Sequence, residues 1–120
     1  MTRIHLALAA AAVCALALSA SVSAMSPTKL TGTVGPGFTI SLKDASGKSV
    51  KTLKAGSYKF MVTDKSSIHN FHLRGPGLNR EITGVGFTEM KSVTLTLKKG
   101  KYTFVCDPHS SSMNGAFTII

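Results

Sequence analysis

The sequence predicts an all-β domain, an antiparallel β-sandwich or barrel, in the part of the chain that follows residue 24. Short runs alternate apolar and polar residues with a period of two, which is the pattern of strands with one buried face. Turn signals rich in Gly, Pro, Asp and Ser separate these runs, as is typical of sandwiches and barrels. We find no helical period after the first 24 residues, so an all-β domain is the simplest interpretation.

Each expected strand rests on its own alternation. Phe38, Ile40 and Leu42 share one face of the first run, while Tyr102 and Cys106 share a face with Phe104 in a later one. Further strands are expected over residues 58–62, 68–73, 93–97 and 117–119. The turn signals lie at residues 35–37, 44–47, 55–56, 75–77 and 99–100. Residues 75–90 show no clear alternation, and we assign them to no element.

The first 24 residues predict a secretory signal peptide. Arg3 and His5 form a short basic start, an apolar run follows over residues 6–18, and the small residues 22–24 fit cleavage after Ala24. An uncleaved membrane anchor is the alternative, but the apolar run is too short to span a bilayer comfortably. We therefore expect one mature domain, residues 25–120, that is exported to the periplasm or the extracellular space without stable membrane insertion.

Cleavage would leave one cysteine in the mature chain. Cys14 belongs to the leader, so only Cys106 remains, and a lone thiol in an exported protein cannot form an internal disulfide. Burial as a small core residue is one explanation. Metal ligation is the other, and the nearby His109 and Met113 favour it.

The mature chain is strongly basic. The full chain has fourteen Lys and Arg and five Asp and Glu, and Arg3 leaves with the leader, so thirteen basic residues remain. Such a charge suits an acidic protein, an anionic membrane surface or nucleic acid, although export disfavours nucleic acid. The alternative is that the lysines only solvate the outer strand faces, because they are spread along the chain.

Two distant segments supply candidate metal ligands. Cys106, His109 and Met113 lie within eight residues, and these soft or borderline donors suit copper better than calcium or magnesium. An imidazole from the run of residues 68–73 would complete a set of two His, one Cys and a weak thioether. That set is the one found in blue-copper electron-transfer sites.

Strand phase selects the histidine. His69 shares its face with Phe71 and Leu73, whereas Asn70 and His72 point to the opposite face. We therefore expect His69 to bind the metal and His72 to be an exposed strand residue. A thiol and a histidine that merely pack together in the core are the alternative.

These motifs resemble those of the small cupredoxins, the plastocyanin, pseudoazurin and amicyanin group. The run His69-Asn70-Phe71-His72-Leu73 is most similar to the amicyanin version, in which the first His binds copper and the second does not. Residues 102–106, the turn Cys106-Asp107-Pro108-His109 and the run Met113-Asn114-Gly115 resemble the segment that carries the other ligands. The likeness covers about residues 30–120.

The resemblance implies a Greek-key sandwich of about eight strands that carries one electron on a single copper ion, as Cu(I) or Cu(II). The ligands would be His69, Cys106, His109 and Met113. The ring edge of His109 would serve as the electron port, and Asn70 would tie the two ligand segments together by hydrogen bonds. We expect a monomer whose partners are a redox donor and acceptor, with acidic partners favoured by the basic charge.

The chain departs from the family pattern near the thiol. Asp107 stands where the family usually has Ser or Thr, and a carboxylate there should lower the reduction potential. Three residues separate His109 from Met113, which leaves the length of the axial bond open. Val105 replaces the aromatic residue of plastocyanin, so a remote electron route through that position is not expected.

Three functions compete. The first is a soluble electron carrier, and the second is a copper-binding protein for storage, delivery or resistance that uses the same site. The third is a sandwich whose Cys106, His69 and His109 bind zinc or nothing. An enzyme is disfavoured, because the sequence offers one candidate metal site and no Ser/His/Asp-type constellation.

Overall fold

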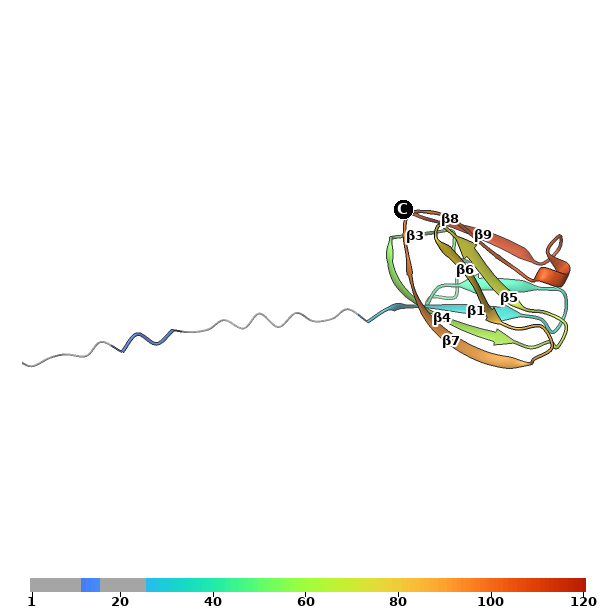
Figure 1. Cartoon of the computed structure of the whole chain (residues 1–120), viewed down its shortest axis with the longest axis horizontal. Coiled ribbons are helices and arrows are strands. Elements are labelled where there is room, and N and C mark those ends of the chain that lie inside the picture. The colour runs from blue at the N-terminus through green and yellow to red at the C-terminus, as the bar shows by residue number, and fades with distance from the viewer. Residues whose placement is uncertain (1–11, 16–25) are drawn as a thin grey trace, which may run out of the picture.

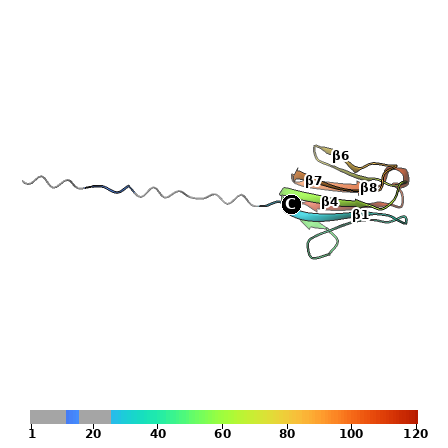
Figure 2. The same ribbon diagram turned by 90° about the horizontal axis from the view of Figure 1, so that it is seen from below.

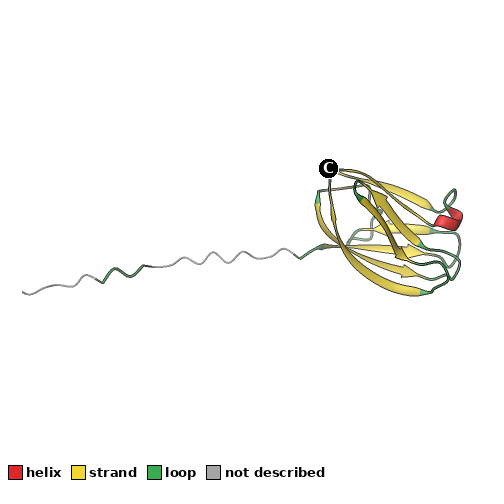
Figure 3. Cartoon of the chain, viewed as in Figure 1, coloured by secondary structure: helices red, strands yellow, loops and turns green. Residues whose placement is uncertain are grey.

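A computed structural model describes residues 12–15 and 26–120 and confirms the all-β sandwich (Figure 1). Most of the predicted leader, residues 1–24, lies outside the described residues. The first sheet has four strands, in the order β2 (Ile40–Lys43), β1 (Thr28–Val34), β4 (Gly56–Asp64) and β7 (Glu89–Leu97). The second has five, in the order β3 (Thr52–Leu53), β9 (Asn114–Ile119), β8 (Gly100–Val105), β5 (Phe71–Gly75) and β6 (Leu78–Thr83). One turn of 3-10 helix, η1, covers Asp107–His109 and lies at one end of the sandwich (Figure 3).

The core lies between the two sheets and follows the predicted alternation. In β8, Tyr102 and Phe104 are buried while Thr103 between them is partly exposed. The ring of Phe104 stacks on Phe71 of β5 at a centroid distance of 5.5 Å, and Tyr102 stacks on Phe117 of β9 at 5.3 Å. These aromatic contacts pack β5, β8 and β9 side by side, which fixes the strands that carry the candidate ligands.

The sheets are mixed, which corrects the expectation of a purely antiparallel sandwich. β1 pairs with β4 in parallel and β3 pairs with β9 in parallel, whereas every other pair is antiparallel. The cause is topological, because β1 enters between β2 and β4 and the chain crosses between the sheets after β2, β3, β4, β6 and β7. Turn signals mark where strands end, but they do not specify which strands become neighbours.

Residues 75–90, which we left unassigned, contain a hairpin and the start of β7. The turn at Gly75 to Leu78 joins β5 to β6, and Gly75 is required because a Cβ there would lie 2.1 Å from Cδ1 of Tyr102. β6 is an edge strand, and only Ile82 and Thr83 of it are buried. An edge strand with little burial has little reason to alternate, so its sequence carried no signal.

The two ends of the sandwich differ. The connections 35–39, 65–70, 84–88 and 106–113 lie at the end that carries η1, which we call the η1 end (Figure 1). The β7–β8 turn, the β3–β4 connection and the start of β1 lie at the opposite end, which we call the far end. Figure 2 shows the strands running between these ends. Among residues 12–15 and 26–120, no helix is long and apolar enough to cross a membrane.

Candidate metal centre

His69 is held by a connection with its own hydrogen bonds. The connection leaves β4, and the carboxylate of Asp64 accepts a hydrogen bond from the backbone N–H of Ser66 at 3.1 Å. The hydroxyl oxygen of Ser66 accepts one from the N–H of Ile68 at 3.3 Å. His69 follows and is fully buried, two residues before β5 begins at Phe71. His69, Phe71 and Leu73 are all buried, as their predicted inward face requires, and Asn70 between them is fully buried as well.

Cys106 and His109 lie on one tight loop. Cys106 directly follows β8 and is fully buried, as its strand phase predicted. Its carbonyl accepts a hydrogen bond from the N–H of His109 at 3.1 Å, and Pro108 fixes the backbone inside this turn. The loop closes when the N–H of Met113 donates to the carbonyl of His109 at 2.8 Å and the N–H of Cys106 donates to the carbonyl of Met113 at 3.0 Å.

The two segments converge on one point. Nδ1 of His69 lies 3.1 Å from Nδ1 of His109, and Sγ of Cys106 lies 3.6 Å from each of these nitrogens. Nε2 of His69 lies 3.0 Å from the carbonyl oxygen of Gly37. Because a carbonyl oxygen only accepts hydrogen bonds, Nε2 of His69 carries the ring proton. Nδ1 of His69 therefore keeps a free lone pair for a metal ion, on the side where Nδ1 of His109 and Sγ of Cys106 lie.

The donor separations fit one shared ion. An ion bound to nitrogen at about 2.0 Å and to sulfur at about 2.3 Å holds such donors roughly 3.3 to 3.7 Å apart at tetrahedral to trigonal angles. The observed distances of 3.1 and 3.6 Å lie close to this range, and the three residues form a metal-ligand cluster. Two imidazoles and a thiolate in a trigonal set are typical of blue-copper sites.

Met113 follows His109 in the same loop and is fully buried. Its backbone pairs with Cys106 and His109. Its burial agrees with either role considered from the sequence, an axial thioether ligand or a core residue that fills a gap. Ligation by Met113 therefore stays a prediction.

Asn70 ties the two ligand segments together, as the family resemblance implied. Its Oδ1 accepts a hydrogen bond from the backbone N–H of Asp107 at 2.7 Å, and its Nδ2 donates to Oδ2 of Asp107 at 2.8 Å. Nδ2 also donates to Oε2 of Glu81 at 3.0 Å. The side chain is fully buried. Asn70 and Asp107, the residues next to His69 and Cys106, are thus joined by two hydrogen bonds, and the third ties Asn70 to β6.

His72 is not the exposed strand residue that we expected. Its side chain is only 12% exposed, because Nδ1 lies 2.7 Å from Oδ2 of Asp107 and Nε2 contacts Oδ1 of Asn79. Alternation gave the face correctly, but it could not predict that Asp107 from another segment would cover this face. His72 points away from the cluster of His69, Cys106 and His109 and takes no part in it.

The carboxylate of Asp107 is occupied on the side away from the cluster. Oδ1 lies 3.2 Å from Nη2 of Arg74, and Oδ2 meets Asn70 and His72. Partial burial raises the pKa of Asp107, but the hydrogen bonds from Asn70 and His72 and the charges of His72 and Arg74 outweigh it, so the pKa lies below its ordinary value. These partners also offset the negative charge that was expected to lower the reduction potential.

Phe38 is a residue of the site that sequence reasoning missed. We expected it to share a core face with Ile40 and Leu42, but it precedes β2 and is 61% exposed. Its ring makes edge contacts with the rings of His69 and His109, at centroid distances of 5.3 and 4.9 Å. The neighbouring turn signal at residues 35–37 was the available clue, because a glycine-rich turn allows close approach to another segment.

Gly35 shows how closely this turn approaches the ligand connection. Its φ is +68°, and a Cβ there would lie 2.9 Å from Cβ of Ser66 and 3.4 Å from Cδ2 of His69. Only glycine adopts this backbone freely and leaves that space. The β1–β2 turn therefore supplies the carbonyl of Gly37 and the ring of Phe38 to the site.

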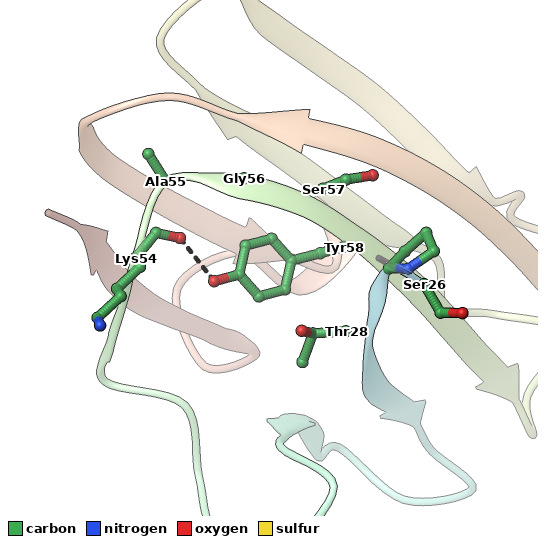
Figure 4. Close-up of a pocket in the computed structure, with 8 residues that line it drawn as sticks. Ser26, Thr28, Lys54, Ala55, Gly56, Ser57 and Tyr58 are labelled. Atoms are coloured by element: carbon green, nitrogen blue, oxygen red, sulfur yellow. Dashed lines mark hydrogen bonds between the residues drawn. The ribbon is translucent and has the colours of Figure 1, made fainter. Parts of the chain in front are cut away.

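A cavity of about 350 Å³ lies away from this cluster, at the far end. The start of β1 and the β3–β4 connection line it, and the hydroxyl of Tyr58 donates a hydrogen bond to the carbonyl of Lys54 at 2.6 Å (Figure 4). None of the candidate ligands touches this cavity.

Comparisons with known proteins agree with the donor set. Residues 45–120 match the family model of copper-binding proteins of the plastocyanin/azurin family. Auracyanin A, a blue copper protein from the green thermophilic photosynthetic bacterium Chloroflexus aurantiacus, superimposes with a TM-score of 0.55 at 17% identity, over 79% of this chain and 100% of that one. Reduced rusticyanin gives 0.52 at 20% identity, over 77% and 76%. A chain of a heme-copper terminal oxidase dimer gives 0.52 at 17%, over 77% and 63%. No curated protein matches by sequence.

Proposed function

Because this chain belongs to the plastocyanin/azurin family of copper-binding proteins, we propose that it is an exported carrier of single electrons. Its copper ligands are His69, Cys106, His109 and, as the weak axial donor, Met113. The observation that carries this proposal is the convergence of Nδ1 of His69, Nδ1 of His109 and Sγ of Cys106 within 3.6 Å of one another. Copper in such a set supplies a one-electron redox couple.

The surroundings of the donors favour electron transfer because they restrict movement. Gly37 fixes the ring of His69, Asn70 joins the two ligand segments, and the backbone bonds of Met113 close the loop. A site whose donors keep their positions in both oxidation states has a low reorganisation cost. Rigid support of this kind is less needed for copper storage, which depends on affinity alone.

His109 offers the route for the electron. Among the three clustered donors it alone is partly exposed, and the ring of Phe38 lies beside it at the surface. A redox donor or acceptor protein can therefore approach the imidazole edge at the η1 end. We expect the partners to be other redox proteins and the chain to show no catalytic turnover of its own.

Storage, delivery or resistance by the same site is the second candidate. It is favoured only by the ligand set, which binds Cu(I) in either role. The two functions differ in kinetics. A carrier exchanges electrons rapidly and keeps its metal, whereas a delivery protein gives the metal up to an acceptor.

The test combines spectroscopy with kinetics on the copper-loaded protein. We expect an intense blue thiolate-to-copper band, an electron paramagnetic resonance spectrum with narrow copper hyperfine splitting, and a reversible voltammetric wave. Electron self-exchange should be fast, and copper should stay bound in the presence of a competing Cu(I) chelator. A colourless complex, or copper lost faster than electrons are exchanged, would refute the carrier function.

A further inference from the structure

Lysines gather at the far end of the sandwich. Lys98 and Lys99 form the β7–β8 turn, and Lys101 follows in β8. Lys54 joins them, because Gly56 pairs with Leu97 and the N–H of Ala55 donates to the carbonyl of Ile120, whose neighbour Ile119 pairs with Gly100. All four lysines are exposed. We call Lys54, Lys98, Lys99 and Lys101 the basic end.

Two further lysines extend the positive charge of the basic end. Lys29 of β1 and Lys59 of β4 are direct partners in the parallel ladder, and both are exposed. Like charges placed opposite one another on a sheet destabilise it. No ion pair of the described residues involves any of these six lysines. The repulsion is therefore left unrelieved within the described domain.

The acidic residues lie elsewhere. Asp64 ends β4 and Glu89 begins β7, both at the η1 end. Glu81 and Asp107 belong to the hydrogen-bond network of Asn70 and His72. Asp44, the last of the five, binds the backbone of its own loop at Ser46 and Lys48. No Asp or Glu of the described residues forms an ion pair with the basic end.

This surface is badly placed for an electron partner. Strands of five to nine residues separate it from the η1 end, which corresponds to about 17 Å or more. An acidic redox protein held at the basic end would therefore lie far from His109 and Phe38. We therefore expect the lysines of the basic end to bind a partner that is not a redox protein.

The shape of the far end suggests which partner it is. The cavity of about 350 Å³ opens beside Lys54, between Pro27, Ala55 and the ring of Tyr58 (Figure 4). Ile120 is 63% exposed next to Ala55. Positive charge around a few apolar groups fits the interface of an anionic bilayer, where lysines meet headgroups and apolar groups enter the acyl boundary.

We propose that the basic end docks on an anionic phospholipid membrane surface and directs the η1 end to the aqueous phase. The contact is peripheral and electrostatic, so it weakens as ionic strength rises. It confines the protein to the membrane surface while His109 stays accessible to redox partners. An acidic protein that binds the basic end is the competing outcome.

Cosedimentation with vesicles tests the proposal. Purified copper-loaded protein is mixed with vesicles of phosphatidylcholine and phosphatidylglycerol, or of phosphatidylcholine alone. One variant changes Lys54, Lys98, Lys99 and Lys101 to Gln. The matched control changes Lys43, Lys48, Lys65 and Lys91 to Gln, which removes the same charge from other surfaces. We expect binding to the anionic vesicles only.

Each lysine near an anionic surface strengthens binding roughly fivefold. The basic-end variant should therefore bind more than about a hundredfold more weakly, while the control should lose less because none of its lysines belongs to the basic end. Equal losses in the two variants would show a general charge effect and would overturn the proposal. So would wild-type protein that ignores anionic vesicles and binds only an immobilised acidic protein.

Orientation is measured separately on the Cu(I) protein, which is diamagnetic. Vesicles that carry a paramagnetic headgroup should broaden the amide signals of residues 54–56 and 98–101 and spare those of residues 37–38 and 109–110. Broadening centred on the second group would overturn the proposed orientation.

Discussion

Replacing Asn70 offers the sharpest test of how the metal centre is assembled. Its side chain makes three hydrogen bonds, one to the backbone N–H of Asp107 and two to the carboxylates of Asp107 and Glu81. A neutral hydrogen bond contributes about 1 kcal/mol and one to a charged group about 1.5–3 kcal/mol. Water recovers part of this, since both carboxylates reach solvent, so Asn70→Ala should cost about 3 kcal/mol.

That cost is a large share of the total, because small domains have free energies of unfolding of about 5–15 kcal/mol. It corresponds to a fall in Tm of about 12–24 °C. Urea unfolding followed by circular dichroism measures it. Asn114→Ala is the control, because Asn114 donates one exposed hydrogen bond to the carbonyl of Ser110 at 2.8 Å and should lose less than about 1 kcal/mol.

A second variant separates the hydrogen bonds from packing. Asn70→Asp keeps the acceptor for the N–H of Asp107 but turns the donor into a third carboxylate that faces Asp107 and Glu81. It should be less stable than Asn70→Ala at neutral pH and should approach the wild type as the pH falls and the carboxylates are protonated. Losses in both Asn70 variants no larger than that of Asn114→Ala would refute the reasoning.

Three further predictions concern individual residues. His69→Gly should abolish the blue band, while His72→Ala should keep it and lower only the free energy of unfolding; colour loss in the second variant alone would overturn the assignment. Met113→Gln should lower the reduction potential and Met113→Leu should raise it, and protein-film voltammetry that finds no shift in either removes Met113 from the site. Burial raises the pKa of Asp64 above its ordinary value of 3.8, so the wild type should lose stability as the pH rises through the pKa of the folded state. Urea unfolding across this pH range measures the loss, and the Asp64→Asn variant should not show it.

The strands that carry the ligands could be predicted because their alternation is complete. Tyr102, Phe104 and Cys106 point inward with no interruption, and His69 keeps the phase of Phe71. Burial of one face forces such a pattern, so the sequence alone identified the two segments that carry the candidate ligands. That these segments meet in space is shown by the distances among their donor atoms in the structure.

Other elements left no such pattern. β1 buries Leu30, Gly32 and Val34, but Gly32 has no side chain because a Cβ there would lie 3.0 Å from the ring of Phe71. The apolar alternation of β1 is therefore broken at its centre. The prediction for Phe38 was wrong for the opposite reason. Phe38 continues the apolar alternation of Ile40 and Leu42, yet it is 61% exposed and its ring contacts His69 and His109. Periodicity reports burial within one strand and carries no information about contacts between loops.

The uneven distribution of charge follows from how the metal centre is supported. Asp64 accepts a hydrogen bond from the N–H of Ser66, Glu89 accepts one from the N–H of Gly84, and Asp107 anchors the ligand loop through Asn70. These acidic residues are needed at the η1 end because its long connections leave backbone donors without a strand partner. The β7–β8 turn at the far end is closed without a carboxylate, because the hydroxyl of Tyr102 accepts a hydrogen bond from the N–H of Lys98 at 3.1 Å and donates one to the carbonyl of Lys98 at 2.8 Å. Because the acidic side chains support the metal centre at the η1 end, the lysines of the far end have no acidic neighbours to pair with among the described residues and stay available to a separate partner.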